Sequence, residues 1–294
     1  MMKSTSIHNL NADKGLNFFK KFAYLFLNWV NNLLPYVFVD KRIKFLKFEP
    51  ALWQETWDKT YPDSSAARKF SDIFWRTLPW QDIKRELGDI HVFDTGCGQG
   101  NYSTRLWDGI TSYTGIDQKR RPNWTVLEKE HPNFHFIESK STGILPLIPP
   151  DTNLFITQSA IEHFDKDLLF FEQIREFIKK SRKPIMQIHL FPAAATLPLY
   201  FFHGVRQYTP RTISKITRLF NDSDISLYPL GSSASKKLQW RYFTWPVLIT
   251  RKYSKPTFDV KIYEPQLKAA FEHDLKYPSQ SPLFWALVIK SNFS

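Results

Sequence analysis

The sequence predicts an α/β fold in which a mostly parallel sheet carries helices on both faces, preceded by a helical extension. Two observations lead to this prediction. From about residue 90 onward, short apolar segments alternate with amphipathic ones, which is typical of strand–helix–strand units. The first apolar segment, Ile90 to Phe93, runs directly into a glycine-rich loop at residues 94–100. Such a loop brings the backbone close to a ligand at the edge of a parallel sheet.

Residues 1–62 are expected to form an amphipathic and basic helical extension. Between residues 16 and 34, apolar side chains recur at helical spacing, opposite lysines and asparagines; they are Phe18, Phe19, Phe22, Leu25, Phe26, Trp29, Val30 and Leu33. Pro35 should end the helix, and basic and aromatic residues alternate over residues 41–48. This combination suits an anionic membrane surface. Packing on the rest of the chain as a cap is the alternative, and the sequence leaves both open.

Residues 63–294 are expected to form the main domain. Two helices lie between Ser64 and about Leu87, with a serine cap and a break at Leu78-Pro79. Later helices are expected at 165–180 and 209–220, and strands at 90–93, 113–117, 133–137, 153–157, 184–189, 225–230 and 283–289. The stretch from about 231 to 282 is longer than a hairpin needs, which indicates an insertion. Its basic and aromatic residues at 236–245 suit contact with an acceptor.

The glycine loop carries the most specific chemical signal. It reads Asp94-Thr95-Gly96-Cys97-Gly98-Gln99-Gly100, with glycines at alternate positions and an acid two residues before the first glycine. The acid would repel a pyrophosphate, so the pattern disfavours a dinucleotide and favours a ligand with an ammonium group. A helix is expected to begin near Asn101, with its first amide groups pointing at the ligand.

Two further elements follow at characteristic positions. Asp117 ends the second strand, 23 residues after Asp94, and the fourth strand leads into Ser159-Ala160-Ile161-Glu162-His163. In this order, the loop, the acid and the Glu-His element resemble the class I methyltransferases that use S-adenosylmethionine (SAM), of the small-molecule or glycan type. The resemblance covers roughly residues 85–230 and the last strand. It implies a Rossmann-like, seven-stranded sheet that closes with a hairpin containing one antiparallel strand.

The resemblance also implies the cofactor contacts. Asp94 and the backbone of Gly96, Gly98 and Gly100 hold the methionine portion of SAM, with Cys97 as a small residue in the same loop. Asp117 takes the ribose hydroxyls, Gln118 flanks the adenine, and Ser141 reaches its edge; Ser159 belongs to the element that lines the cofactor and the acceptor. The chain departs from the usual pattern at Ser141 and Asn153, where the family often has aspartates.

Candidate bases are His163 and His189, at the carboxyl ends of the fourth and fifth strands, where ligands of such sheets bind. Glu162 is expected either to orient His163 or to form a surface ion pair. His203 and Tyr208 are further residues on the acceptor side. A structural role for each histidine is the alternative, and alignment without a dedicated base is another. No cysteine or histidine spacing predicts a metal site.

Charge and composition narrow the functional classes. The net charge of +12 favours anionic partners. The single cysteine, Cys97, excludes an intrachain disulfide, and apolar runs fall far short of the roughly 20 residues of a membrane span. We expect a cytoplasmic protein, free or peripheral on the inner face of the membrane. O-methylation of a small-molecule or carbohydrate-like acceptor, including a lipid-linked glycan, is the leading hypothesis. Nucleic-acid methylation and a non-catalytic, SAM-binding protein at a membrane are the alternatives.

Overall fold

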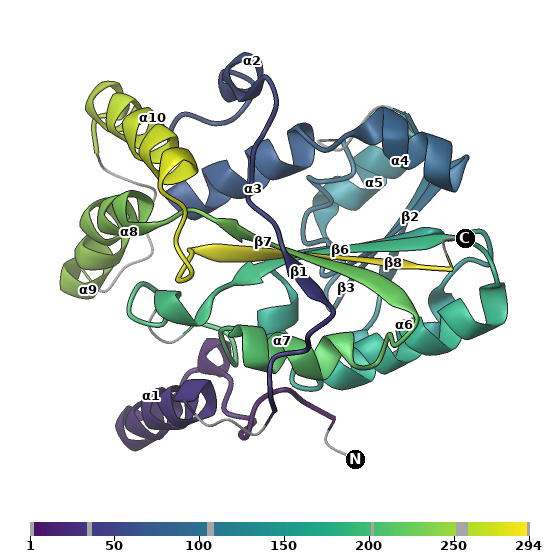
Figure 1. The fold of residues 1–294 in the computed structure, drawn as a ribbon, viewed down its shortest axis with the longest axis horizontal. Coiled ribbons are helices and arrows are strands. Elements are labelled where there is room, and N and C mark those ends of the chain that lie inside the picture. The colour runs from purple at the N-terminus through teal and green to yellow at the C-terminus, as the bar shows by residue number, and fades with distance from the viewer. Residues whose placement is uncertain (1–2, 34–36, 105–108, 201–202, 251–257, 293–294) are drawn as a thin grey trace.

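The computed structural model describes residues 3–33, 37–104, 109–200, 203–250 and 258–292. An eight-stranded sheet runs through the centre of the described part, in the order β1-β7-β8-β6-β5-β2-β3-β4 (Figure 1). The strands are β1 (Ile43–Phe45), β2 (Ile90–Thr95), β3 (Ile110–Asp117), β4 (Phe134–Glu138), β5 (Leu154–Gln158), β6 (Ile185–Pro192), β7 (Ser223–Leu230) and β8 (Phe284–Ser291). β8 is antiparallel to both of its neighbours, and the other pairs are parallel.

The eighth strand, β1, is the difference from the seven predicted. It lies within the segment 41–48, where Ile43 is buried and pairs with Ile225 of β7, while Lys44 and Phe45 are exposed. The alternation of basic and apolar residues is therefore that of an edge strand. An exposed lysine on such a strand discourages pairing with other chains.

Helices cover both faces of the sheet, as predicted. On one face lie α3 (Ala66–Arg76), α4 (Trp80–Leu87) and α5 (Pro122–Glu130), and on the other α6 (Asp167–Ser181) and α7 (Pro210–Thr217) (Figure 1). Each face has its own apolar core, one around Phe70 and Trp124 and one around Phe171 and Ile213. The predicted caps are confirmed: Arg68 N donates to Ser65 Oγ, and Thr209 forms a capping box with Thr212.

The predicted insertion at 231–282 contains mainly helices. They are α8 (Ser233–Gln239), a π-helix (Trp240–Thr244), α9 (Trp245–Thr250) and α10 (Val260–Lys276); residues 251–257 lie outside the described part. Asp274 of α10 accepts hydrogen bonds from the backbone N–H groups of Ser232 and Ser235 at 2.6 and 2.9 Å, which satisfy the first turn of α8.

The N-terminal segment begins on the α6 and α7 side of the sheet, with a 3-10 helix (Ala12–Lys14) and α1 (Phe18–Leu33) (Figure 1). After β1 it continues on the other side, where Trp53 and Trp57 of α2 (Trp53–Trp57) belong to the same apolar core as Phe70 of α3. Hydrogen bonds near the start of the chain attach this segment to the rest of the protein: Thr5 N donates to Asp167 Oδ1 at 2.8 Å, and Ala12 N donates to Gly204 O at 2.8 Å. The predicted stop at Pro35 lies outside the described residues. No helix in the described ranges is both long and apolar enough for a bilayer crossing.

Candidate cofactor and acceptor site

The glycine loop follows β2 and is fixed to the neighbouring strand. The N–H groups of Gly96 and Cys97 both donate to Ile116 O of β3, at 2.7 and 3.0 Å. Gly96 has a φ of +83°, and a Cβ there would lie 2.4 Å from Ala160 Cβ, so only glycine fits. Gly98 also has a positive φ, but open space surrounds the position of its missing Cβ. Residues 101–104 form turns instead of the expected helix start, and 105–108 lie outside the described part.

Three pockets meet beside this loop, at the carboxyl ends of β2, β3 and β5. We name them by one residue each: the Asp117 pocket, the Asp94 pocket and the Glu162 pocket, with cavity volumes of 310, 360 and 160 Å³. Gly96 lines the first two, Ser159 the first and third, and Gln158 the second and third. A ligand that fills the first two pockets therefore passes the entrance of the third.

The Asp117 pocket gathers three residues that the sequence assigned to the nucleoside. Asp117, Gln118 and Ser141 all line it. Asp117 Oδ2 accepts a hydrogen bond from Gly98 N at 3.0 Å, and its Oδ1 accepts one from Lys119 N at 3.3 Å. Asp117 thus lies between the glycine loop and the end of β3, where its carboxylate faces the pocket that a ribose would enter.

The Asp94 pocket combines a buried acid with a guanidinium. Tyr113 donates its hydroxyl to Asp94 Oδ2 at 2.5 Å. Burial, with a smaller contribution from Asp117, raises the pKa of Asp94 to about 7, although the Tyr113 hydrogen bond opposes this shift. Arg68 of α3 lines the same pocket, and its Nη1 donates to the hydroxyl of Tyr102 at 2.8 Å. A cavity with one acid and one guanidinium complements a zwitterionic amino-acid group.

Arg68 carries no motif, and the sequence analysis did not identify it. The only available signal was its place on a helix expected just before the first strand. Arg68 also lines the Glu162 pocket, so the side chain lies where the two cavities adjoin.

Cys97 and Ser159 have structural roles at the loop and at the junction. Cys97 is buried, and its burial together with Asp94 and Asp117 raises the pKa of its thiol well above the usual range. It behaves as a small packing residue. Ser159 has a φ of +50°, and its Oγ accepts from Gln158 Nε2 at 3.2 Å. A left-handed serine at the meeting point of two pockets fits the tendency of strained backbone to occur at functional sites.

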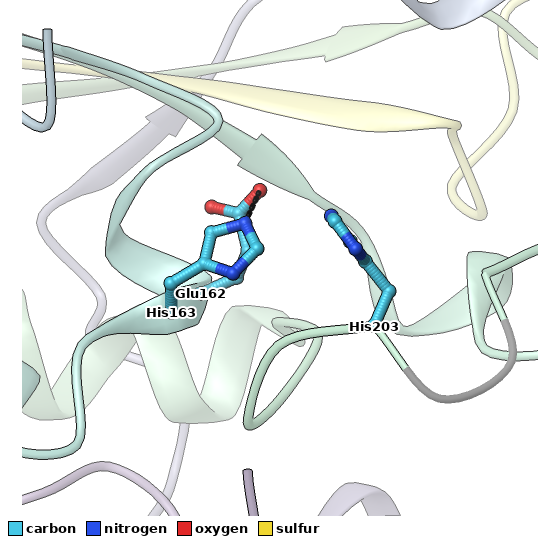
Figure 2. A group of neighbouring side chains, drawn as sticks. All are labelled: Glu162, His163 and His203. Atoms are coloured by element: carbon cyan, nitrogen blue, oxygen red, sulfur yellow. Dashed lines mark ion pairs between the residues drawn. The ribbon is translucent and has the colours of Figure 1, made fainter. Parts of the chain in front are cut away.

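Glu162, His163 and His203 form a polar wall between the Glu162 pocket, which Glu162 and His203 line, and the Asp117 pocket, which His163 lines (Figure 2). Glu162 is only 1% exposed, it lines the Glu162 pocket, and its Oε2 has no hydrogen-bond partner among the described residues. His163 Nε2 lies 3.9 Å from Glu162 Oε1. The rings of His163 and His203 meet edge to face, with centroids 4.6 Å apart. The structure therefore brings together two predicted catalytic residues and one residue proposed for the acceptor side.

Asp13, which the sequence analysis missed, holds this wall from the N-terminal segment. His163 Nδ1 donates to Asp13 Oδ2 at 2.5 Å, and Gly204 N donates to Asp13 Oδ1 at 3.0 Å. Asp13 and His163 are 150 positions apart in the chain. No local pattern reveals such a pair, because only packing of the N-terminal segment brings the two residues into contact.

The protonation of the cluster follows from burial and mutual charge. Burial raises the pKa of Glu162 to about 7, partly offset by the charge of His163. Burial lowers the pKa of His163, but the Asp13 hydrogen bond and the charge of Glu162 more than compensate, so its pKa lies above the usual value. The pKa of His203 is lowered, first by burial and then by the charge of His163. Glu162 is thus the group of the cluster that burial tunes to neutrality.

His189 and Tyr208 lie away from the three pockets. β6 continues three residues beyond His189, to Pro192, so this histidine is not at the strand end. It is fully buried against Phe170 and Phe171, and Thr157 hydrogen-bonds its Nδ1 at 3.0 Å. Burial lowers its pKa to about 3. The structure corrects the expectation for His189: it is a packing residue without access to an acceptor. Tyr208 is buried as well, and its hydroxyl donates to Asp167 Oδ2.

The sequence analysis predicted no metal site because no cysteines or histidines have the spacing of metal ligands along the chain. The fold nevertheless brings together three residues that could ligate a metal ion. One ligand atom from each of Glu162, His163 and His203 lies within 4.8 Å of the others. Zinc–ligand bonds of about 2.0–2.1 Å would require these atoms to move closer together.

Asn153, the other departure from the usual pattern, ties β5 to its surroundings: it accepts a hydrogen bond from His91 N and donates to Leu87 O and Asp89 O.

The strand order and the single antiparallel strand β8 decide the architecture. The chain has the Rossmann-like class I methyltransferase fold. β4-β3-β2-β5-β6 form its parallel part, β8 and β7 its closing hairpin, and β1 adds an edge strand. No protein-family model matches the sequence, and no curated protein matches it.

Several solved structures are similar in shape. A SAM-dependent methyltransferase from Archaeoglobus fulgidus has 17% identity and a TM-score of 0.45, over 82% of this chain and 98% of that one. The 1,6-didemethyltoxoflavin-N1-methyltransferase of Burkholderia thailandensis, with its substrate and S-adenosylhomocysteine bound, has 11% identity and a TM-score of 0.42, over 81% and 85%. The cyclase SpnF has 13% identity and a TM-score of 0.46, over 79% and 84%.

Proposed function

We propose that the protein binds SAM and transfers its methyl group to an oxygen of a small-molecule or carbohydrate-like acceptor, including a lipid-linked glycan. One observation carries this proposal. A pocket suited to an amino-acid group and a pocket suited to a nucleoside adjoin at Gly96, and each shares a lining residue with a third pocket that contains a buried carboxyl, one oxygen of which has no hydrogen-bond partner among the described residues. That arrangement suits a cofactor and an acceptor bound end to end.

The residues of the first two pockets fit the cofactor. An ammonium group would compensate a charge on the buried Asp94, whose one hydrogen bond among the described residues comes from the Tyr113 hydroxyl. Arg68 suits the carboxylate of the same amino acid. Asp117 suits the ribose hydroxyls, and Gln118 and Ser141 suit the adenine. The open space at Gly98 leaves room for the ligand against the loop backbone.

The third pocket supplies the chemistry of the acceptor. SAM, when bound, would supply a methyl group on its sulfonium, to whose carbon an acceptor oxygen would bond in line as the carbon–sulfur bond breaks and the neutral thioether leaves. Glu162 accepts the proton of the acceptor hydroxyl, because its side chain lines the pocket, its Oε2 has no hydrogen-bond partner among the described residues, and its pKa of about 7 is near the operating pH. His163 lies beside this carboxyl as a positioning residue, with Asp13 fixing the ring. Arg68 and Tyr200 on the same wall orient the acceptor.

Calorimetry with SAM tests the cofactor assignment. We expect Asp117→Ala to weaken SAM affinity about tenfold or more, since it removes a charge-assisted pair of hydrogen bonds. The matched control is Asp222→Ala, at an exposed acid outside the pockets. Equal affinity of the Asp117 variant and the control would contradict the ribose contact.

A labelling experiment tests the acceptor class. The purified protein is incubated with methyl-labelled SAM and fractionated cell extract, and the label is followed into each fraction. We expect it in the small-molecule or lipid-linked glycan fraction, as an ether that resists mild base. Label in nucleic acid, with binding that falls steeply with salt, would contradict the proposal and favour the nucleic-acid alternative.

A further inference from the structure

Helix α1 has its polar face turned inward and its aromatic face turned outward. Tyr24, Asn28 and Asn31 are buried, while the large apolar side chains of the opposite face are exposed. These are Phe18, Phe19, Phe22, Phe26, Trp29 and Leu33, with Phe19 at 82% exposure. We call these six residues the aromatic face of α1. Burial would stabilise these apolar side chains, and exposed apolar patches mark interaction sites. We therefore expect a partner to cover this face.

Polar contacts hold the helix in this orientation. The hydroxyl of Tyr24 donates to His203 O at 3.0 Å, and Ile7 N donates to Asn31 Oδ1 at 3.2 Å. At the other end, Arg211 Nη1 donates to Leu33 O at 3.2 Å. These contacts involve the inward face and the helix end, so the outward direction of the aromatic face is set by the fold.

Further apolar surface lies at the same end of the molecule. Phe38 and Val39 are exposed shortly after α1, as are Trp245, Leu248 and Ile249 of α9. Figure 1 shows α1 and α9 at the end of the molecule toward which the parallel strands run. An apolar groove of 530 Å³, lined by Val39, Phe45, Leu46 and Trp285, adds to this surface. Two separate helices and a groove thus expose apolar groups around the side from which an acceptor approaches.

Charge identifies the kind of partner. Lys20 in the first turn of α1 and Lys41 after its end are exposed, and within the described part of the chain neither has an acid as an ion-pair partner. The whole chain carries +12. Aromatic side chains flanked by lysines favour the interface of a bilayer that contains anionic headgroups, where rings lie at headgroup depth and ammonium groups meet phosphate.

We propose that the aromatic face of α1 docks the protein on a lipid bilayer with anionic headgroups. Docking requires no spanning helix, because an amphipathic helix lies in the plane of the interface. Tyr24 hydrogen-bonds the carbonyl of His203, which lines the Glu162 pocket. The docked helix therefore holds the entrance of that pocket next to the bilayer, where an acceptor with a lipid anchor presents its polar group.

Vesicle flotation of the full chain tests the docking. The vesicles contain phosphatidylcholine alone or with about 30% phosphatidylglycerol. We expect the protein to float with the anionic vesicles, less so at high salt. The combined variant Phe19→Ser, Phe22→Ser and Phe26→Ser should lower the bound fraction about tenfold or more. The matched control, Val126→Ser with Ile262→Ser, changes exposed apolar side chains on α5 and α10 and should bind like the unaltered chain.

Three outcomes would overturn the proposal. The first is equal flotation of the α1 variant and the unaltered chain. The second is equal or absent binding to both vesicle types. The third is self-association that the α1 variant abolishes without any vesicle binding, which would make the face a contact between two copies. Flotation needs no SAM, and calorimetry with SAM needs no vesicle, so failure of docking and failure of the methyltransferase proposal are separate results. Circular dichroism confirms that each variant is folded.

Discussion

At the scale of single residues, burial decides which carboxyl can act as a base. Glu162 follows the fourth predicted strand, and the sequence analysis expected it to orient His163 or to form a surface ion pair. The fold removes it from water, leaves one of its oxygens without a hydrogen-bond partner among the described residues and places it at the Glu162 pocket. His163, which the sequence analysis offered as a base with Glu162 as its orienting residue, is instead tied to Asp13 and lines the Asp117 pocket. We therefore propose the reverse assignment, with Glu162 as the base and His163 as the positioning residue.

Replacing Glu162 by glutamine tests this assignment. We expect kcat to fall about 10²- to 10⁴-fold, because the variant cannot accept a proton, with SAM affinity almost unchanged. In the unaltered enzyme, activity should rise with pH through about 7, as Glu162 loses its proton; the variant should lack this limb. A variant with normal kcat and a normal pH profile would show that the base lies elsewhere.

The raised pKa of Glu162 also affects the stability of the protein. This pKa is higher in the folded protein than in the unfolded chain, so the Glu162 carboxyl favours the folded state at pH values below about 4.5. That contribution is lost as the pH rises toward 7. The folded protein is therefore less stable when Glu162 is ionised, which is the form proposed to accept a proton. Other interactions in the fold must offset this loss of stability.

At the scale of elements, a position can require glycine for its backbone conformation or for the space that a ligand needs. Comparing a glycine of the loop with one outside it distinguishes these two requirements. Gly98 and Gly88 both have positive φ, and at both a Cβ would enter open space. Only Gly98 lines a proposed cofactor pocket. The two glycines thus offer a comparison in which both positions have positive φ and open space, and only Gly98 lines a pocket.

We expect Gly98→Ala and Gly88→Ala both to destabilise the protein, because each forces an L-residue into a positive-φ backbone conformation that such residues rarely adopt. SAM affinity should fall sharply only in Gly98→Ala, whose methyl group would occupy space meant for the ligand. Urea denaturation gives the stabilities and calorimetry the affinities. Parallel loss of affinity in both variants would place the ligand elsewhere.

At the scale of the whole molecule, buried charges join the N-terminal segment to the sheet. Arg206 and Asp167 are both fully buried, with Arg206 Nη1 3.3 Å from Asp167 Oδ2. Asp167 also accepts hydrogen bonds from Thr5 and from Tyr208, and Arg206 Nη2 donates to Ser4 Oγ. Since the same segment delivers Asp13 to His163, this network connects overall stability with the geometry of the site.

We expect Asp167→Asn to lower the free energy of unfolding by about 3–5 kcal/mol, because Arg206 would remain buried without a counter-charge. Asp165→Asn is the control: Asp165 pairs with Lys14 on the surface at 2.8 Å, and its loss should cost less than about 1 kcal/mol. Urea titration measures both. A small effect of Asp167→Asn would mean that the N-terminal segment is not held by this network.

The sequence by itself determined the α/β class, the main strands, and the glycine loop between Asp94 and Asp117. These depend on local periodicity and on residue types at short spacing, which the chain carries wherever it folds. Only the tertiary structure decided that Asp13 meets His163, that Arg68 lines the Asp94 pocket, that His189 is buried, and which face of α1 points outward. The physical reason is that periodicity shows a helix to be two-sided, whereas burial and ionisation depend on groups that distant segments bring together.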